Sequence, residues 1–243
     1  MALTNKLKAI ADAIRGKTGK TEEMTLDQMA TEIAGIQSGG GISEQDILDA
    51  LMCNQWPAGD VLITGGNKGV TFAENKYITT VTFRVTNAHY ILSARCFANN
   101  TALKSVLDGG VTYYSSNNVF TGCTALEEYV MERDSCTTAL DTQLFNGCTA
   151  LRYFDGSVNF AIINNKAFEG CTALKTIVLR RTSAPVTLVA NAFTNSSLAE
   201  GGTGCTIYVP AALIEQYPIE TNWSVWDAYG TITWKSIEGS EYE

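Results

Sequence analysis

The sequence predicts a mainly β solenoid with a short α-helical N-terminal module and an aromatic C-terminal cap. The main observation is a phenylalanine that recurs at intervals of 23, 25, 23 and 25 residues between positions 97 and 193. A second observation is the sequence motif around this phenylalanine, since three copies share Phe-x-Gly-Cys-Thr-Ala-Leu. Self-similarity at such a period is the signature of stacked repeats, each forming one coil of a solenoid. The copies are residues 97–103, 120–126, 145–151, 168–174 and a degraded 193–198.

Residues 1–38 are expected to form a helical module for attachment or oligomerisation. Apolar residues at spacings of three and four define one face of each of two helices. These residues are Leu3, Leu7, Ile10 and Ile14, followed by Leu26, Met29 and Ile33. Helices this short do not bury an apolar face alone, so we expect them to pair with each other or with another subunit. Serine and three glycines then end the module, and residues 39–59 are interpreted as a linker with one short helix.

Residues 60–234 are interpreted as the solenoid with its cap, and each repeat is predicted to contain two short strands. One strand follows each Thr-Ala-Leu, where the leucine and the apolar residue three places on should point inward. The other surrounds an apolar residue five places before each phenylalanine. Strands are also predicted at residues 61–63, 69–72 and 78–83, which places the start of the solenoid near residue 60. Gly122, Gly147 and Gly170 suit a left-handed backbone position in the turn after the phenylalanine.

The C-terminal part of the solenoid departs from the repeat. A strand is predicted at residues 205–209, and Pro210 should open a short helix over 211–216 because proline is favoured at the first helical position. The aromatic residues of 221–234 are expected to cover the exposed end of the stack, which a solenoid requires. Residues 235–243 are interpreted as a tail, of which residues 238–243 are expected to be frayed.

Charge and cysteine usage exclude several classes of protein. The formal net charge of −8 argues against nucleic acid as a partner, and no run approaches the roughly 18 apolar residues of a membrane span. Three of the seven cysteines occupy the same place in successive repeats. We therefore interpret them as small apolar fillers of the interior, kept as reduced thiols, rather than as disulfides or metal ligands. No metal and no cofactor are expected.

Two groups invite a catalytic interpretation, and the sequence favours a structural one for both. His89 has no nucleophile or carboxylate motif nearby. Glu127 and Glu128 suggest the paired acids of a glycosidase, but other repeats carry lysine, serine or threonine at these two places, which is typical of a solvated face. The sequence therefore predicts a binding or structural module and no enzyme. The candidates for an exposed binding surface are Tyr113, Tyr114, Tyr153 and Asp155, since exposed aromatic rings anchor sugars or protein partners.

The repeats resemble a known family. Residues 167–174, followed by Ile177 and Leu179, are similar to the BspA-like leucine-rich repeat, and residues 207–224 resemble the way such arrays close. The likeness covers residues 60–234, and it implies a leucine-rich-repeat-like solenoid that binds a partner. In this family the expected function is that of a bacterial cell-surface adhesin.

A second resemblance concerns the N-terminus. Residues 7–33 look like the N-terminal segment of tail-associated proteins in phages of Gram-positive bacteria. The resemblance implies a non-enzymatic tail or fibre protein of the virion, assembled in the host cytoplasm and bound to other tail proteins as a homo-oligomer, with a trimer favoured. Its solenoid would contact a glycan or protein of the bacterial surface. Because the N-terminus contains no secretory signal, we favour this function, with the adhesin as the alternative.

Overall fold

The structure is a computed structural model that describes residues 59–63, 72–84, 94–109, 117–135 and 137–243. These residues belong to one compact unit, Gly59–Glu243. The predictions for residues 1–58 lie outside the described residues, as do those for His89, Tyr113 and Tyr114. No helix in the described part of the chain is long and apolar enough to span a bilayer.

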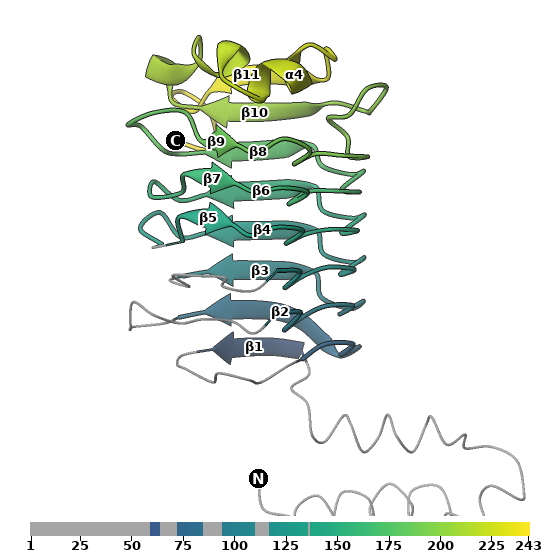
Figure 1. The fold of residues 1–243 in the computed structure, drawn as a ribbon. Helices are drawn as coiled ribbons and strands as arrows, with labels where there is room; N and C mark the ends of the chain where they lie inside the picture. The colour runs from purple at the N-terminus through teal and green to yellow at the C-terminus, as the bar shows by residue number, and fades with distance from the viewer. Residues whose placement is uncertain (1–58, 64–71, 85–93, 110–116, 136) are drawn as a thin grey trace, which may run out of the picture. The chain divides into compact units, whose positions relative to one another are not determined.

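The described unit is a parallel β-solenoid, which confirms the solenoid of the predicted fold class, whereas the predicted helical N-terminal module stays a prediction (Figure 1). One strand from each coil joins an eight-stranded parallel sheet, in which neighbouring strands come from successive coils. In spatial order the strands are β1 (Gly59–Ile63), β2 (Ile78–Phe83), β3 (Ser105–Asp108), β4 (Glu128–Met131), β6 (Tyr153–Gly156), β8 (Thr176–Leu179), β10 (Cys205–Val209) and β11 (Ile232–Ser236). A second parallel sheet contains β5 (Ala139–Leu140), β7 (Ile162–Ile163) and β9 (Thr187–Leu188). Three coils therefore show both predicted strands.

Side chains along the strands of the large sheet point alternately inward and outward, and the inward ones fill the interior. Residues in register across neighbouring strands form an inward row whose members are at most 2% exposed. This row is Val81, Val106, Tyr129, Phe154, Ile177 and Ile207. Every row member except Ile207 lies three residues after the apolar residue that begins its repeat strand, and those apolar residues are also buried. The inward positions predicted from the Thr-Ala-Leu phrase are confirmed.

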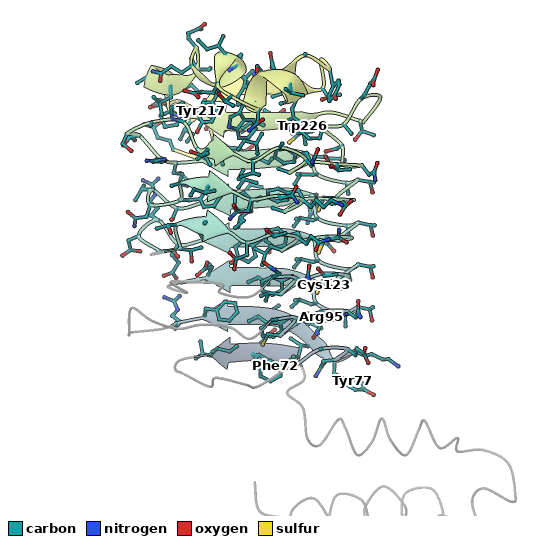
Figure 2. All side chains as sticks on the ribbon, viewed as in Figure 1. Phe72, Tyr77, Arg95, Cys123, Tyr217 and Trp226 are labelled. Carbon is teal, nitrogen blue, oxygen red and sulfur yellow. The ribbon has the colours of Figure 1, made fainter. Side chains whose placement is uncertain are left out.

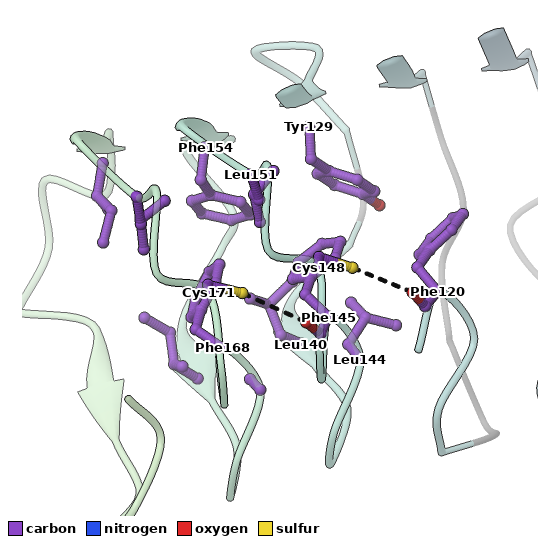
Figure 3. Packing of buried hydrophobic residues seen from close by; sticks show 14 of the residues in the cluster. Phe120, Tyr129, Leu140, Leu144, Phe145, Cys148, Leu151, Phe154, Phe168 and Cys171 are labelled. Carbon is purple, nitrogen blue, oxygen red and sulfur yellow. Dashed lines mark hydrogen bonds between the residues drawn. The ribbon is translucent and has the colours of Figure 1, made fainter. Parts of the chain in front are cut away.

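The recurring phenylalanines stack into a continuous ladder through the interior, of which Figure 3 shows Phe120, Phe145 and Phe168. Ring centroids of successive coils lie 5.1, 5.5, 5.9, 5.4 and 5.3 Å apart in the series Phe72, Phe97, Phe120, Phe145, Phe168 and Phe193. Interplanar angles of 8–27° make these offset stacks, a favourable arrangement for aromatic pairs. The predicted strand at residues 69–72 is wrong at Phe72, which lies outside any strand and begins the ladder. Residues 69–71 lie outside the described part.

The repeat cysteines are buried and reduced, as predicted, but they are more than apolar fillers. The thiols of Cys148 and Cys171 donate to the carbonyl oxygens of Phe120 and Phe145 in the preceding coil, at 3.1 and 3.3 Å (Figure 3). Cys123 does the same one coil earlier. Burial raises the pKa of the Cys123 thiol to about 12, so these groups stay neutral.

The C-terminal cap closes the end of the ladder (Figure 2). Trp223 and Trp226 lie 5.8 and 5.7 Å from Phe193, and the fully buried indole of Trp223 donates to the carbonyl of Val186 at 2.7 Å. The predicted helix at 211–216 is shorter and is a 3-10 helix, η1 (Ala211–Leu213), which Pro210 precedes. It is followed by η2 (Tyr217–Ile219) and α4 (Trp223–Asp227). Sequence reasoning missed β11, which adds the last strand to the sheet.

Candidate functional site

The outer face of the large parallel sheet carries two rows of side chains that point away from the interior. The first outer row consists of Thr80, Ser105, Glu128, Tyr153, Thr176, Thr206 and Thr233. The second outer row consists of Thr82, Leu107, Val130, Asp155, Val178, Tyr208 and Lys235. The first row is mostly hydroxyl-bearing, whereas the second changes chemical character at almost every coil. The second row is thus apolar at β3 and β4, charged at β6 and aromatic at β10.

Residues 237–243, here named the C-terminal strap, cross this face. The prediction of a frayed tail is wrong for them, because the Tyr242 ring stacks on Tyr153 at 5.8 Å and meets Tyr208 edge-on at 4.6 Å. Figure 1 accordingly places the chain end at the level of β8 and not beside β11. Since β8 lies between β6 and β10, the Tyr242 ring lies over β8. Burial and the neighbouring Glu241 carboxylate raise the pKa of Tyr242.

Val178 shows that the strap covers the outer face. Its side chain is 0% exposed, yet it is not part of the interior cluster to which its neighbours Ile177 and Leu179 belong. It occupies the second outer row of β8, in register with Asp155 on β6 and Tyr208 on β10, the two strands whose tyrosines contact the Tyr242 ring. Leu107 and Val130, in the same row, lie beyond the strap and stay partly exposed. The outer face therefore has a covered part over β6–β10 and an open part over β2–β4.

Asp155 is buried, which corrects the prediction that it is exposed. Its carboxylate accepts two hydrogen bonds from Arg180, Nε at 2.7 Å and Nη2 at 2.8 Å, and a third from the Tyr153 hydroxyl at 3.0 Å. The ion-paired side chains of Asp155 and Arg180 are only 8% and 12% exposed. Arg180 also donates from Nη1 to the carbonyl oxygen of Tyr242 at 2.6 Å. The hydrogen bonds to Asp155 raise the pKa of Arg180, so this cation is permanent.

A hollow lies beside the strap at the C-terminal end of the sheet. Its volume is about 570 Å³, and it is lined by Tyr208, Ile214, Trp234, Lys235 and the strap residues 238–241, with Ser236 at its edge. The ammonium of Lys235 lies 5.9 Å from the centre of the Tyr208 ring, within cation–π range. At the start of the strap Glu238 accepts hydrogen bonds from the Ser236 hydroxyl and the Ala211 amide, and these lower its pKa.

Of the candidate binding residues, the structure places Tyr153 and Asp155 together, as neighbours on the outer side of β6. Tyr153 is half-buried under Tyr242, and burial, followed by the Asp155 charge, raises the pKa of its phenol. Sequence reasoning missed Tyr208, Arg180 and Tyr242. Tyr208 had a signal, because alternation along residues 205–209 points it outward. Tyr242 had none, since it lies outside every repeat.

The chemistry that this arrangement offers is recognition. It combines aromatic stacking, a fixed cation that donates a hydrogen bond to the strap, and a row of hydroxyl groups. Glu127, one of the two acids weighed for catalysis, is in an ion pair with Arg152 at 2.8 Å. Within the described ranges no group of three or more histidine, cysteine, aspartate or glutamate side chains is arranged to hold a metal ion.

Comparison with known proteins assigns the repeats. The model of the BspA type leucine-rich repeat region matches six copies over residues 69–200, more than half of the chain. The chain belongs to the BspA-type leucine-rich repeat family. This confirms the resemblance of the repeats, whereas the resemblance of residues 7–33 to phage tail proteins has no counterpart in the comparisons and stays a prediction.

Among solved structures, a leucine-rich repeat protein from Bacteroides ovatus ATCC 8483 is similar at 16% identity and a TM-score of 0.39. The match covers 74% of this chain and 54% of that one, so the chain spans about half the length of this structural relative. No curated protein matches the chain.

Proposed function

We propose that this protein is a non-enzymatic binding protein that presents the outer face of its parallel sheet to a partner on a cell surface. The second outer row carries the proposal, because its residues differ from coil to coil while the inward row stays apolar throughout. A stack of repeats with a constant interior and a variable outer face offers an extended recognition surface. Membership of a leucine-rich repeat family supports the same role.

The open part of the outer face is the place to test this proposal. Leu107→Arg and Val130→Arg each place a charge on a partly exposed apolar position that has no role in the interior. Ile162→Arg is the matched control, because Ile162 is 37% exposed and lies in the smaller sheet. The full chain would be applied to glycan arrays, to arrayed extracellular-matrix proteins and to whole bacterial cells.

The expected result is that the binding affinity of both outer-face variants falls at least tenfold, because disrupting a contact at the centre of an interface removes much of its binding energy. The Ile162→Arg variant should bind like the wild type. All three must unfold at similar denaturant concentrations. Equal binding by all four proteins would refute the outer face as the recognition surface.

For the setting of this binding we propose a bacterial cell-surface adhesin, which the family match favours. The second candidate is a component of a phage tail or fibre that binds the host surface, with residues 1–38 attaching it to other tail proteins as a homo-oligomer. That candidate is supported by the resemblance of residues 7–33 to the N-terminal segment of phage tail-associated proteins. An antibody against the solenoid distinguishes the two: decoration of intact bacteria supports the adhesin, whereas labelled tails on purified particles overturn it.

A further inference from the structure

We propose that the covered part of the outer face is a binding site for a tyrosine side chain in an extended segment of a partner protein, and that Tyr242 is its built-in occupant. The inference rests on the proposed function and names the class of partner. We define the tyrosine slot by Tyr153 and Tyr208 as its walls, Val178 as its floor and Arg180 at its side. A partner segment enters the slot by displacing the strap.

The slot is shaped for an aromatic ring. Tyr242 contacts one wall by stacking and the other edge-on, with centroid distances of 5.8 and 4.6 Å. Both geometries are favourable for aromatic pairs. Val178 on β8, the strand between those of the two walls, is 0% exposed and supplies an apolar floor. The Tyr242 hydroxyl is also hydrogen-bonded to the side chain of Thr176 in the first outer row of β8, a contact that favours tyrosine over phenylalanine.

Arg180 adds recognition of the main chain. Its Nη1 donates to the carbonyl oxygen of Tyr242, while Nε and Nη2 are held by the two carboxylate oxygens of Asp155. Because Asp155 belongs to β6 and not to the strap, its two hydrogen bonds to the guanidinium remain when the strap leaves, and they keep the guanidinium in its orientation. A donor fixed in advance costs less entropy on binding than one that must be ordered. The slot thus binds an aromatic ring and the main-chain carbonyl of the same residue, a combination that a peptide provides.

The strap is held weakly enough to be displaced. Residues 238, 239, 241 and 243 are exposed, and several hydrogen bonds of the strap are internal to it. Its start is anchored, because the Ile237 amide donates to the Val209 carbonyl and Glu238 binds the Ala211 amide. Between this anchor and Tyr242 the strap borders the 570 Å³ hollow instead of filling it. An element with few buried contacts opens at low free energy.

The test compares the full chain with its Tyr242→Ala variant. The probe is a fluorescently labelled peptide with the sequence of residues 236–243, Ser-Ile-Glu-Gly-Ser-Glu-Tyr-Glu, titrated to millimolar concentration because the tethered strap competes at an effective concentration of that order. We expect the variant to bind the peptide about tenfold more tightly than the wild type, since an occupied site lowers apparent affinity in proportion to its free fraction. The same peptide with alanine in place of tyrosine should not bind.

Two further variants complete the design. Tyr229→Ala removes a tyrosine that is 41% exposed on the cap, away from the slot, and should leave peptide binding at the wild-type level. Tyr153→Ala added to Tyr242→Ala removes a wall and should abolish binding, with unchanged unfolding as the check on the fold.

Three outcomes overturn the inference. One is equal peptide binding by the wild type and the Tyr242→Ala variant. Another is binding that survives loss of Tyr153. The third is a wild-type dimer that Tyr242→Ala dissociates, because straps exchanged between copies would then explain the slot. None of these depends on Leu107 or Val130, so the tyrosine slot and the proposed outer-face function can fail separately.

Discussion

The inside and the outside of the same strands follow opposite rules. At the position three residues after the ladder phenylalanine, successive coils place Asn75, Asn100, Cys123, Cys148, Cys171 and Ser196, all buried and all small. One strand position away from the inward row, the second outer row runs from threonine through leucine, valine and aspartate to tyrosine and lysine. The interior is repeated because each coil must stack on the next, whereas the outer face has no such neighbour to satisfy.

The difference teaches where stability and recognition lie in this protein. Stacked rings and buried donors link each coil to the next, so a change there is felt as a loss of stability. The outer face bears on stability only where the strap and the Asp155–Arg180 ion pair give it a partner. Substitutions on the two sides of one strand should therefore differ sharply in their effects.

The largest effect is expected for a ring in the middle of the ladder. Phe145→Ala removes a 0% exposed side chain that stacks on Phe120 and Phe168, and it should lower the free energy of unfolding by about 3–5 kcal/mol. Val130→Ala, on the outer side of the preceding coil, should cost less than about 1 kcal/mol because Val130 is partly exposed. Guanidinium denaturation of the full chain measures both, and similar losses for the two would contradict the comparison.

The next effect tests the exception on the outer face. Asp155→Leu leaves Arg180 only 12% exposed and without its carboxylate partner, so we expect a loss of about 3 kcal/mol in the free energy of unfolding. The double variant Asp155→Leu/Arg180→Met removes both charges and should recover most of that loss, because an apolar pair carries no desolvation penalty. If the double variant is as unstable as the single one, the carboxylate matters for reasons other than its pairing with Arg180.

The same contrast explains what could be predicted from the sequence. The inward row, the second strand, the left-handed glycines and the buried cysteines were predictable because each recurs in successive copies at a fixed place. Phe72 was missed as a ladder ring because the residues after it, from Ala73 to Ile78, share little with the later phrase. Asp155 does lie on the outer side of β6, but its burial was not predictable, because it depends on Arg180, which reaches it from the next coil. The position of the strap could not be predicted, because it lies outside the repeats and no other coil contains an equivalent segment that would indicate where it packs.

A smaller effect concerns the turn after the phenylalanine. Gly147 has φ of 73°, and Asn99 and Asn195, at the same place in other coils, have φ of 59° and 54°. Gly147→Ala should cost about 1–2 kcal/mol in the free energy of unfolding, because alanine is strained in the left-handed region. The nearest atoms to an added Cβ lie 3.9 Å away, so the cost is conformational and not steric.

Gly147→Asn is the matched control for that strain. Asparagine tolerates the left-handed region, and the chain already uses it at this place, so the loss should be clearly smaller than for alanine. Thermal unfolding of the two variants side by side gives the comparison. An asparagine variant no more stable than the alanine variant would show that the turn requires glycine for a reason other than its φ.

The smallest effect is expected at the interior position of Cys148, where different coils place different small side chains. Cys148→Ser keeps a donor for the Phe120 carbonyl, which the thiol contacts at 3.1 Å, and serine already occupies the equivalent place at Ser196. Cys148→Ala removes the donor, and it should cost about 1 kcal/mol in the free energy of unfolding, the value of an ordinary hydrogen bond. The serine variant should stay within about 0.5 kcal/mol of the wild type, since it keeps that hydrogen bond. If alanine is the better replacement, the place selects for apolar volume alone, and the carbonyl contact contributes nothing to the stacking of coils.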